Sequence, residues 1–119
     1  DPTALTNAGV AVLRQGDLPN AGELLRRGVE IDPTQPKAWN ALGVIAARSG
    51  RREEAITDWK RTVELDPTQY DTLYNLGMLC LQLGDRAEAR KHFEAFTKSA
   101  PPALYTRDLD EVRRILATF

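Results

Sequence analysis

The sequence predicts an all-α protein built from repeated helix pairs, and the main reason is a repeat period. Four columns of identical residues recur at intervals of 34 positions: Gly9, Gly43 and Gly77; Gly16, Gly50 and Gly84; Ala21, Ala55 and Ala89; and Pro33, Pro67 and Pro101. A period of roughly 20 to 50 residues is typical of supersecondary units that stack to bury a continuous core. Between these columns, apolar residues recur at helical spacing, and a glycine or proline closes each stretch.

The composition indicates a soluble globular domain and excludes several functions. The chain has 119 residues, of which 42% are hydrophobic and 28% are charged, as in ordinary soluble domains. Its net charge of −1 argues against nucleic acid, which needs clustered basic residues. We expect no signal peptide in this sequence, and no apolar run in it approaches the ~18 residues of a spanning helix. Cytoplasm and periplasm are both left open.

Three further features bear on the origin of the chain. Twelve arginines against four lysines suggest a GC-rich bacterial source. The chain starts at Asp1 rather than at Met, so we expect it to be a fragment of a longer protein. Cys80 is the only cysteine, so no internal disulfide can form, and the sequence does not indicate an oxidising compartment.

The first helix pair is predicted from its terminators. Residues 3–15 form the first helix, which Gly16 ends. The turn Asp17–Asn20 starts a second helix that runs to about Ile31, with Pro19 in its first turn. This second helix contains two glycines, Gly22 and Gly28, each costing about 0.5–1 kcal/mol relative to alanine. The first pair should therefore be the least stable.

The second pair has the clearest pattern. Thr34 is expected to cap a helix over 35–49 that carries Pro36 in its first turn and ends at Gly50. A helix over 52–65 follows and stops before Pro67, because proline cannot continue a helix. The apolar residues of the two helices are Trp39, Leu42, Ile45, Ala46, Ala55, Ile56, Trp59, Val63 and Leu65.

The third pair and the last segment complete the prediction. Helix 69–83 ends at Gly84, and Thr68 with Asp71 resembles a capping box at its start. Helix 86–99 then meets the run Ala100–Pro102. Residues 104–119, with Thr106 as the expected N-cap, lack the repeat glycines but keep one apolar stripe. A terminal repeat leaves an apolar side exposed, so we interpret this seventh helix as a cap. Its stripe consists of Tyr105, Leu109, Val112, Leu116 and Phe119.

These columns resemble the tetratricopeptide repeat (TPR) family, whose repeat is 34 residues long. The second repeat carries the signature at its expected positions: Trp39, Leu42, Gly43, Ala46, Gly50, Ala55, Trp59 and Pro67. The third repeat fits as well, with Leu73, Leu76, Gly77, Gly84, Ala89, Phe93 and Pro101. The first repeat departs from the pattern, with Leu5 for Trp, Ala8 for Leu and Gly28 for Ala. The resemblance covers residues 2–101.

The resemblance implies a fold and a domain organisation. It predicts a right-handed superhelical α-solenoid of antiparallel helix pairs, in which first helices line the concave face. Residues 1–119 form one domain, with repeats at 2–35, 36–69 and 70–101 and a capping helix at 102–119. The glycine and the alanine columns should mark the closest approach of the two helices in a pair, with the large residues beside them.

The resemblance also implies a binding groove. Five positions of each first helix point into the groove in this family: Thr3, Thr6, Val10, Leu13 and Arg14 in repeat one; Lys37, Asn40, Val44, Ala47 and Arg48 in repeat two; and Asp71, Tyr74, Met78, Leu81 and Gln82 in repeat three. Several are apolar, which suits a peptide or helix groove. The same residues could instead pack under the terminal helix, under a neighbouring repeat or in an oligomer, or face solvent.

Enzyme chemistry has little support in the sequence. His92 is the only histidine, and its charged helix predicts that it faces solvent. Cys80 stands at a packing position and is interpreted as a small buried hydrophobe. No cluster has metal-ligand spacing and no glycine-rich phosphate loop is present, so we expect neither metal nor cofactor.

The sequence thus predicts a non-catalytic protein–protein interaction module that binds a peptide or helix in its concave groove. The alternative is a docking or oligomerisation appendage of a larger bacterial protein, such as an enzyme, with self-association as one outcome. Some TPR proteins grip C-terminal carboxylates through an Asn after the glycine and paired Lys or Arg. Here Val10, Val44 and Met78 follow the glycines, so this clamp is absent.

Overall fold

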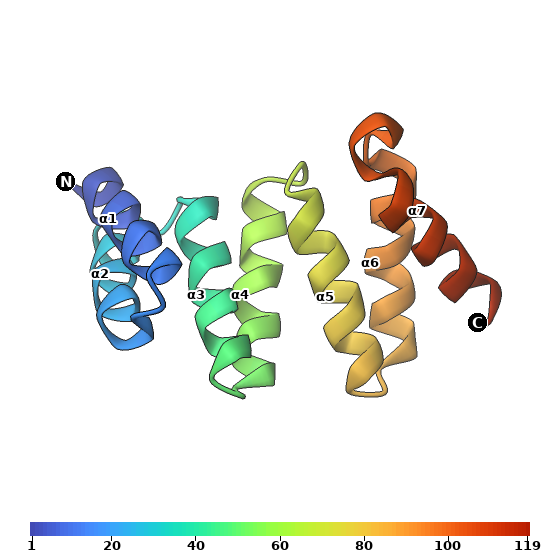
Figure 1. Ribbon diagram of the computed structural model, residues 1–119, viewed down its shortest axis with the longest axis horizontal. Coiled ribbons are helices and arrows are strands. Elements are labelled where there is room, and N and C mark those ends of the chain that lie inside the picture. Colours follow the sequence, from blue (N-terminus) through green and yellow to red (C-terminus); the bar gives the residue numbers. More distant parts are fainter. The chain divides into compact units, whose positions relative to one another are not determined.

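The computed structural model describes residues 1–119 and contains seven helices and no strands, as predicted (Figure 1). The predicted ranges differ from the observed ones by one or two residues at some ends. In chain order the helices are α1 (Pro2–Arg14), α2 (Leu18–Ile31), α3 (Pro36–Arg48), α4 (Arg52–Leu65), α5 (Tyr70–Gln82), α6 (Arg86–Ser99) and α7 (Pro102–Ala117). None of them is both long and apolar enough to span a membrane.

The repeated glycines end the first helix of each pair in the same way. Gly16, Gly50 and Gly84 have φ angles of 87°, 79° and 85°, in the left-handed region. In each case the next residue donates its backbone N–H to a carbonyl in the last turn of the helix, at 2.8–3.3 Å. This is the hydrogen-bond pattern that a glycine after a helix end allows. The glycine column therefore places three identical turns.

The expected threonine caps were wrong. The N-caps of α3 and α5 are Gln35 and Gln69, and neither makes a side-chain capping bond. Thr34 instead donates both its backbone N–H and its hydroxyl to the carboxylate of Asp32. Proline at the start of α3 fixes its first φ angle without needing a cap.

Helix α7 starts at Pro102, the first residue of the predicted capping segment 102–119 but ahead of the expected N-cap Thr106, because proline suits a first turn. The hydroxyl of Thr106 donates to the carbonyl of Pro102 rather than capping a new helix. The predicted start corresponds to a kink, since Tyr105 has φ −125° and ψ 27° within α7.

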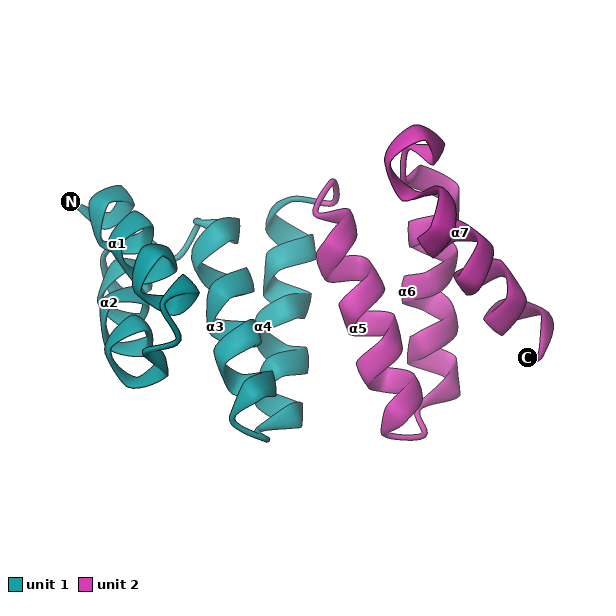
Figure 2. Cartoon of the chain, viewed as in Figure 1, with its two compact units in different colours: residues 1–66 teal, residues 67–119 magenta.

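The chain divides into two compact units, residues 1–66 and residues 67–119 (Figure 2). In unit 1, α1 packs on α2 and α3 packs on α4, while α3 also contacts both helices of the first pair. In unit 2, α5 packs on α6, and α6 contacts α7. The assignment of residues 1–119 to one domain of three repeats remains a prediction.

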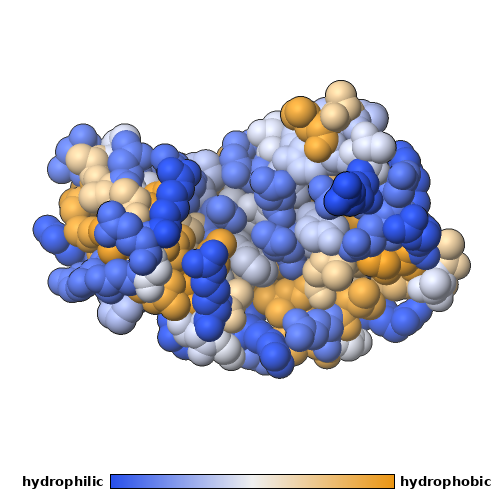
Figure 3. All heavy atoms as spheres, viewed as in Figure 1, coloured by the Kyte–Doolittle hydropathy of each residue, from blue (hydrophilic) through white to orange (hydrophobic).

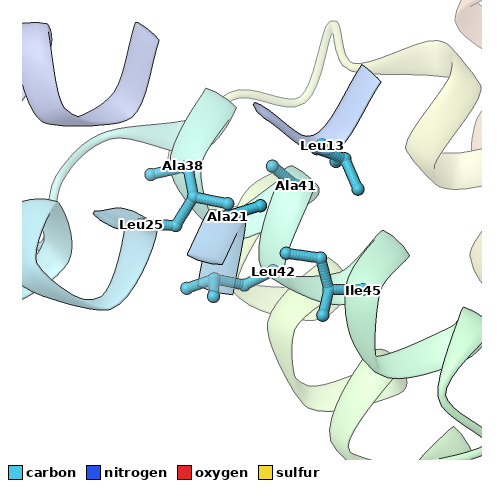
Figure 4. Close-up of a cluster of buried hydrophobic side chains, with 7 residues drawn as sticks. All are labelled: Leu13, Ala21, Leu25, Ala38, Ala41, Leu42 and Ile45. Atoms are coloured by element: carbon cyan, nitrogen blue, oxygen red, sulfur yellow. The ribbon is translucent and has the colours of Figure 1, made fainter. Parts of the chain in front are cut away.

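Unit 1 has a core shared by its first three helices. The cluster of buried side chains in Figure 4 comes from α1, α2 and α3, and Ala21 and Ala38 are fully buried where the helices meet. Small residues at these points let the large ones interdigitate, as dense packing requires. The members are Leu13, Ala21, Leu25, Ala38, Ala41, Leu42 and Ile45.

In each helix pair, a glycine of the first helix lies against a large side chain of the second helix. A Cβ atom on Gly77 would lie 2.5 Å from Cε1 of Phe93, and one on Gly43 would overlap the indole of Trp59. On Gly9 it would lie 2.6 Å from Cγ of Leu25. The resemblance predicted close approach at this column, and the structure shows that the large side chain of the second helix fills the space directly.

The capping helix packs as predicted. Leu109 and Val112 of α7 are fully buried, and Tyr105 meets Phe96 edge to face, with 5.6 Å between ring centroids. At the far end, the guanidinium of Arg86 lies 4.4 Å from the ring centroid of Phe119, a cation–π contact. The apolar stripe of α7 therefore covers the surface that α6 would otherwise expose.

The single histidine was predicted to face solvent, and this prediction was wrong. The side chain of His92 is only 5% exposed. Helix α6 contacts both α5 and α7, so less of its circumference is free than its charged sequence suggests. Cys80 is buried, in agreement with its interpretation as a packing residue.

Candidate binding faces

The predicted groove residues of unit 1 lie on α1 and α3, which contact each other. The Nζ atom of Lys37 on α3 donates to Oδ1 of Asn7 on α1 at 3.0 Å, which joins the exposed sides of the two helices. We call the surface formed by Val10, Arg14, Lys37, Asn40, Val44 and Arg48 the α1–α3 face.

Thr6 was predicted for this surface, but it is only 2% exposed. Its hydroxyl donates to Oε1 of Gln35 at 2.9 Å, and Nε2 of Gln35 donates in turn to the carbonyls of Gly28 and Asp32. A Cβ on Gly28 would lie 3.0 Å from the hydroxyl oxygen of Thr6. Gly28, in place of the usual alanine, thus makes room for Thr6. This departure from the repeat pattern was the signal in the sequence that could have indicated the burial of Thr6.

Leu13 is also withdrawn from the predicted groove, since it is 8% exposed and belongs to the core cluster (Figure 4). Its side chain is enclosed because α3 packs beside α1. Helical periodicity places Leu13 on one side of α1 but does not say whether α3 covers that side.

The remaining residues form an apolar strip with a cationic rim. Val10 and Val44 are partly buried and pack against the core cluster. Arg14, Lys37 and Arg48 are exposed, and no predicted groove position of unit 1 is a carboxylate. In Figure 3, hydrophobic patches of unit 1 lie between strongly hydrophilic side chains. This arrangement suits a partner segment that carries both apolar and acidic residues.

In unit 2, the corresponding side of α5 is engaged by α7. The hydroxyl of Tyr74 donates to Oε1 of Glu111, and its ring contacts Phe96 with 5.8 Å between centroids. Met78 and Leu81 are partly buried, while Asp71 and Gln82 are exposed. The sequence could not indicate the Tyr74–Glu111 bond, because the partners are 37 positions apart. The terminal helix therefore occupies part of the predicted ligand surface of α5.

Carboxylates lie close to two tyrosines of unit 2. The hydrogen bond to Glu111 is the main cause that raises the pKa of Tyr74 to about 12, and burial and Asp108 add to it. Burial raises the pKa of Tyr105, with a further contribution from Asp71. Among the predicted groove positions, unit 2 has Asp71 where the second repeat has Lys37, and the uncharged Gln82 where the first two repeats have Arg14 and Arg48.

We expect the Tyr74–Glu111 hydrogen bond to stabilise the folded state and this contribution to be lost at alkaline pH. A raised pKa means that the folded state holds the phenol proton more tightly than the unfolded state. The contribution should be complete below pH 10 and should disappear as the pH rises toward 12. Urea unfolding of the wild type and of Tyr74→Phe should therefore differ at pH 8 and converge in this range. Gln82→Ala, an exposed change on the same helix at a residue that does not titrate, is the control and should show no such convergence.

The helix pairs, their glycine turns and the exposed sides of their first helices define a helical-repeat protein. The chain belongs to the tetratricopeptide repeat family, because the sequence profile of that family matches residues 1–36 and 40–103. This confirms the resemblance seen in the sequence. No curated protein sequence matches the chain.

Solved structures share this fold at low sequence identity. The type III secretion translocator chaperone SycD of Yersinia enterocolitica is 16% identical, covering 98% of this chain and 81% of that one, with a TM-score of 0.83. SycD in complex with a peptide of the translocator YopD matches over 98% and 89%, with the same identity and TM-score. The first TPR domain of RPAP3 (Spaghetti), bound to the HSP90 peptide SRMEEVD, is 21% identical over 98% and 93%, with a TM-score of 0.80.

Proposed function

We propose that the chain is a non-catalytic protein-interaction module whose α1–α3 face binds an acidic peptide or helix of another protein. The observation that carries the proposal is the strip formed by Val10 and Val44 between three exposed cations. Apolar contacts supply affinity at such surfaces, while complementary charge supplies orientation and a faster encounter. The peptides bound to SycD and RPAP3 in their solved structures support this mode of binding.

The proposed ligand differs from a chaperone C-terminus. The residues that follow the first two repeat glycines are Val10 and Val44, where the carboxylate-binding members of the family use asparagine. The α1–α3 face is therefore proposed to recognise acidic side chains within a segment. The burial of both His92 and Cys80 supports the non-catalytic assignment, because a nucleophile and its base must reach a substrate.

Selection of binders from a displayed library of random peptides tests the proposal. We expect the selected peptides to be enriched in Asp and Glu beside apolar residues. Replacing Arg14 and Arg48 by serine should weaken their affinity roughly tenfold, or about 1.4 kcal/mol, and raising the salt concentration should weaken it further. Fluorescence anisotropy with labelled peptides measures both effects.

Arg27→Ser with Arg52→Ser is the matched control. It removes the same charge from exposed positions of α2 and α4 and should leave the affinity unchanged. Equal losses in the two double variants would refute the assignment of the site to the α1–α3 face. Light scattering over a range of concentrations distinguishes this function from self-association, since a binding module with a free face stays monomeric.

A further inference from the structure

Unit 1 contains a second concave site, away from the α1–α3 face. A cavity of about 210 Å³ opens between α2 and α4, and α3 forms its floor. Ligand pockets for drug-sized molecules measure roughly 300–1,000 Å³, so this cavity matches a single side chain. Its lining residues are Arg26, Val29, Glu30, Trp39, Leu42, Ile45, Arg51, Glu54 and Asp58.

The floor of the cavity is apolar and its aromatic ring is held in place. Leu42 and Ile45 are buried beneath it, and Val29 and Trp39 remain partly exposed. The indole N–H of Trp39 donates to the carbonyl of Pro33 at 2.8 Å, which fixes the ring. A fixed indole is the best aromatic partner for a cationic or planar group.

The charges around the cavity are not balanced. Arg26 and Arg51 face three carboxylates, those of Glu30, Glu54 and Asp58. Nε of Arg51 pairs with Glu54. The guanidinium of Arg26 lies over its own helix. Two of its nitrogens are 3.3 and 3.4 Å from the position that a Cβ atom on Gly22 would occupy. The lining of this cavity therefore has one carboxylate more than it has cations.

Asp58 is partly buried, whereas Glu30 and Glu54 are exposed. Burial and the neighbouring Glu54 raise the pKa of Asp58 to about 6, while Arg51 opposes the shift. The ionised form of Asp58 is disfavoured in the folded state. The free energy of unfolding therefore falls as the pH rises from the ordinary pKa of an aspartate, 3.8, through 6. Asp58 and Trp39 also line an adjacent cavity of about 290 Å³ beside Lys60, Arg61 and Glu64. Together with Arg26 and Glu30 on α2, these are the charged groups around Asp58.

We propose that this cavity binds the side chain of an arginine from a partner protein, with the guanidinium on Asp58 and against the Trp39 indole. The guanidinium is planar, weakly hydrated and always charged, so it suits a half-buried carboxylate beside an aromatic ring better than an ammonium does. The apolar floor accommodates its methylene stem. Because the site lies on α2 and α4, unit 1 can hold this partner and the ligand of the α1–α3 face at once.

The test titrates the chain with N-acetyl-L-arginine amide and follows the NMR signal of the Trp39 indole N–H, assigned with Trp39→Phe. We expect a saturable shift with the arginine compound, a weaker one with N-acetyl-L-lysine amide and none with N-acetyl-L-citrulline amide, which has a similar shape without the charge. A shift that does not saturate, or one of equal size with citrulline, overturns the proposal.

Two further arms of the experiment test the role of Asp58. Asp58→Asn should weaken arginine binding at least roughly tenfold, as loss of a charge-assisted hydrogen bond does. Glu53→Gln, an exposed residue of α4 outside the cavity, should not change it. Lowering the pH from 7.5 to 5 should also weaken binding roughly tenfold, because most Asp58 is then protonated.

A stability measurement shows that the variant is folded. Asp58→Asn should raise the unfolding temperature at pH 7.5, since the disfavoured ionised carboxylate is gone. Retained arginine affinity in this folded variant contradicts the proposal. Displacement by arginine amide of a peptide selected for the α1–α3 face would show that the two sites are one. If the proposal for one of the two sites is contradicted, the test of the other site is unaffected.

Discussion

Replacing Phe93 by alanine lowers the free energy of unfolding of unit 2 by about 3–5 kcal/mol, the usual cost of truncating a buried aromatic residue. Phe93 is fully buried and faces Gly77 at the centre of the α5–α6 pair. Gly77 has no side chain that could move into the space. The neighbouring helices can close the resulting cavity only by shifting, so the loss should fall in the upper part of this range.

The measurement is urea unfolding followed by far-UV circular dichroism. Because the chain forms two compact units, amide hydrogen exchange should show whether the loss is confined to residues 67–119. Lys91→Ala, an exposed change on the same helix, should stay within about 0.5 kcal/mol of the wild type. A loss below about 1 kcal/mol for Phe93→Ala is incompatible with its role as a core residue.

Two glycine-to-alanine substitutions in unit 1 should change stability in opposite directions. Alanine normally stabilises a helix by about 0.5–1 kcal/mol relative to glycine. At Gly22 the new methyl group meets only the far end of the exposed Arg26 side chain, at 3.3 Å, and this end can shift by a few tenths of an ångström, so the gain should be realised. At Gly43 it overlaps the indole of Trp59, which is buried and donates its N–H to the carbonyl of Asn40. Gly43→Ala should therefore lose about 1–3 kcal/mol by overpacking.

A double-mutant cycle identifies the cause of the loss. In a Trp59→Ala background the indole is absent, and Gly43→Ala should then be neutral or stabilising. The same unfolding assay measures all four proteins of the cycle. A Gly43→Ala cost that persists without the indole would place the clash elsewhere, and the explanation of the glycine column would fail.

Many of the fold predictions were correct because they depended on local signals. A glycine after a helix end and a proline in a first turn act through the backbone of a few neighbouring residues. Three turns built on Gly16, Gly50 and Gly84 follow directly, and with them most helix ends. The threonine caps failed because other local partners, such as Asp32 for Thr34, competed for the same side chains.

The candidate sites were less predictable, because they depend on which helices cover one another. Thr6 and Leu13 lie on the predicted side of α1, but Gln35 and α3 enclose them. The Tyr74–Glu111 bond joins helices distant in sequence. The cavity at Asp58 draws its walls from three helices, so no single stretch of sequence contains its pattern.

The sequence by itself determined the repeat, the helix pairs and many of the apolar residues that form the core. These properties follow from periodicity and backbone conformation, which act over a few residues. The tertiary structure alone decided which of the outward-facing residues remain exposed and which carboxylates are desolvated. Exposure and pKa depend on atoms contributed by other helices, so they are set only when the helices pack.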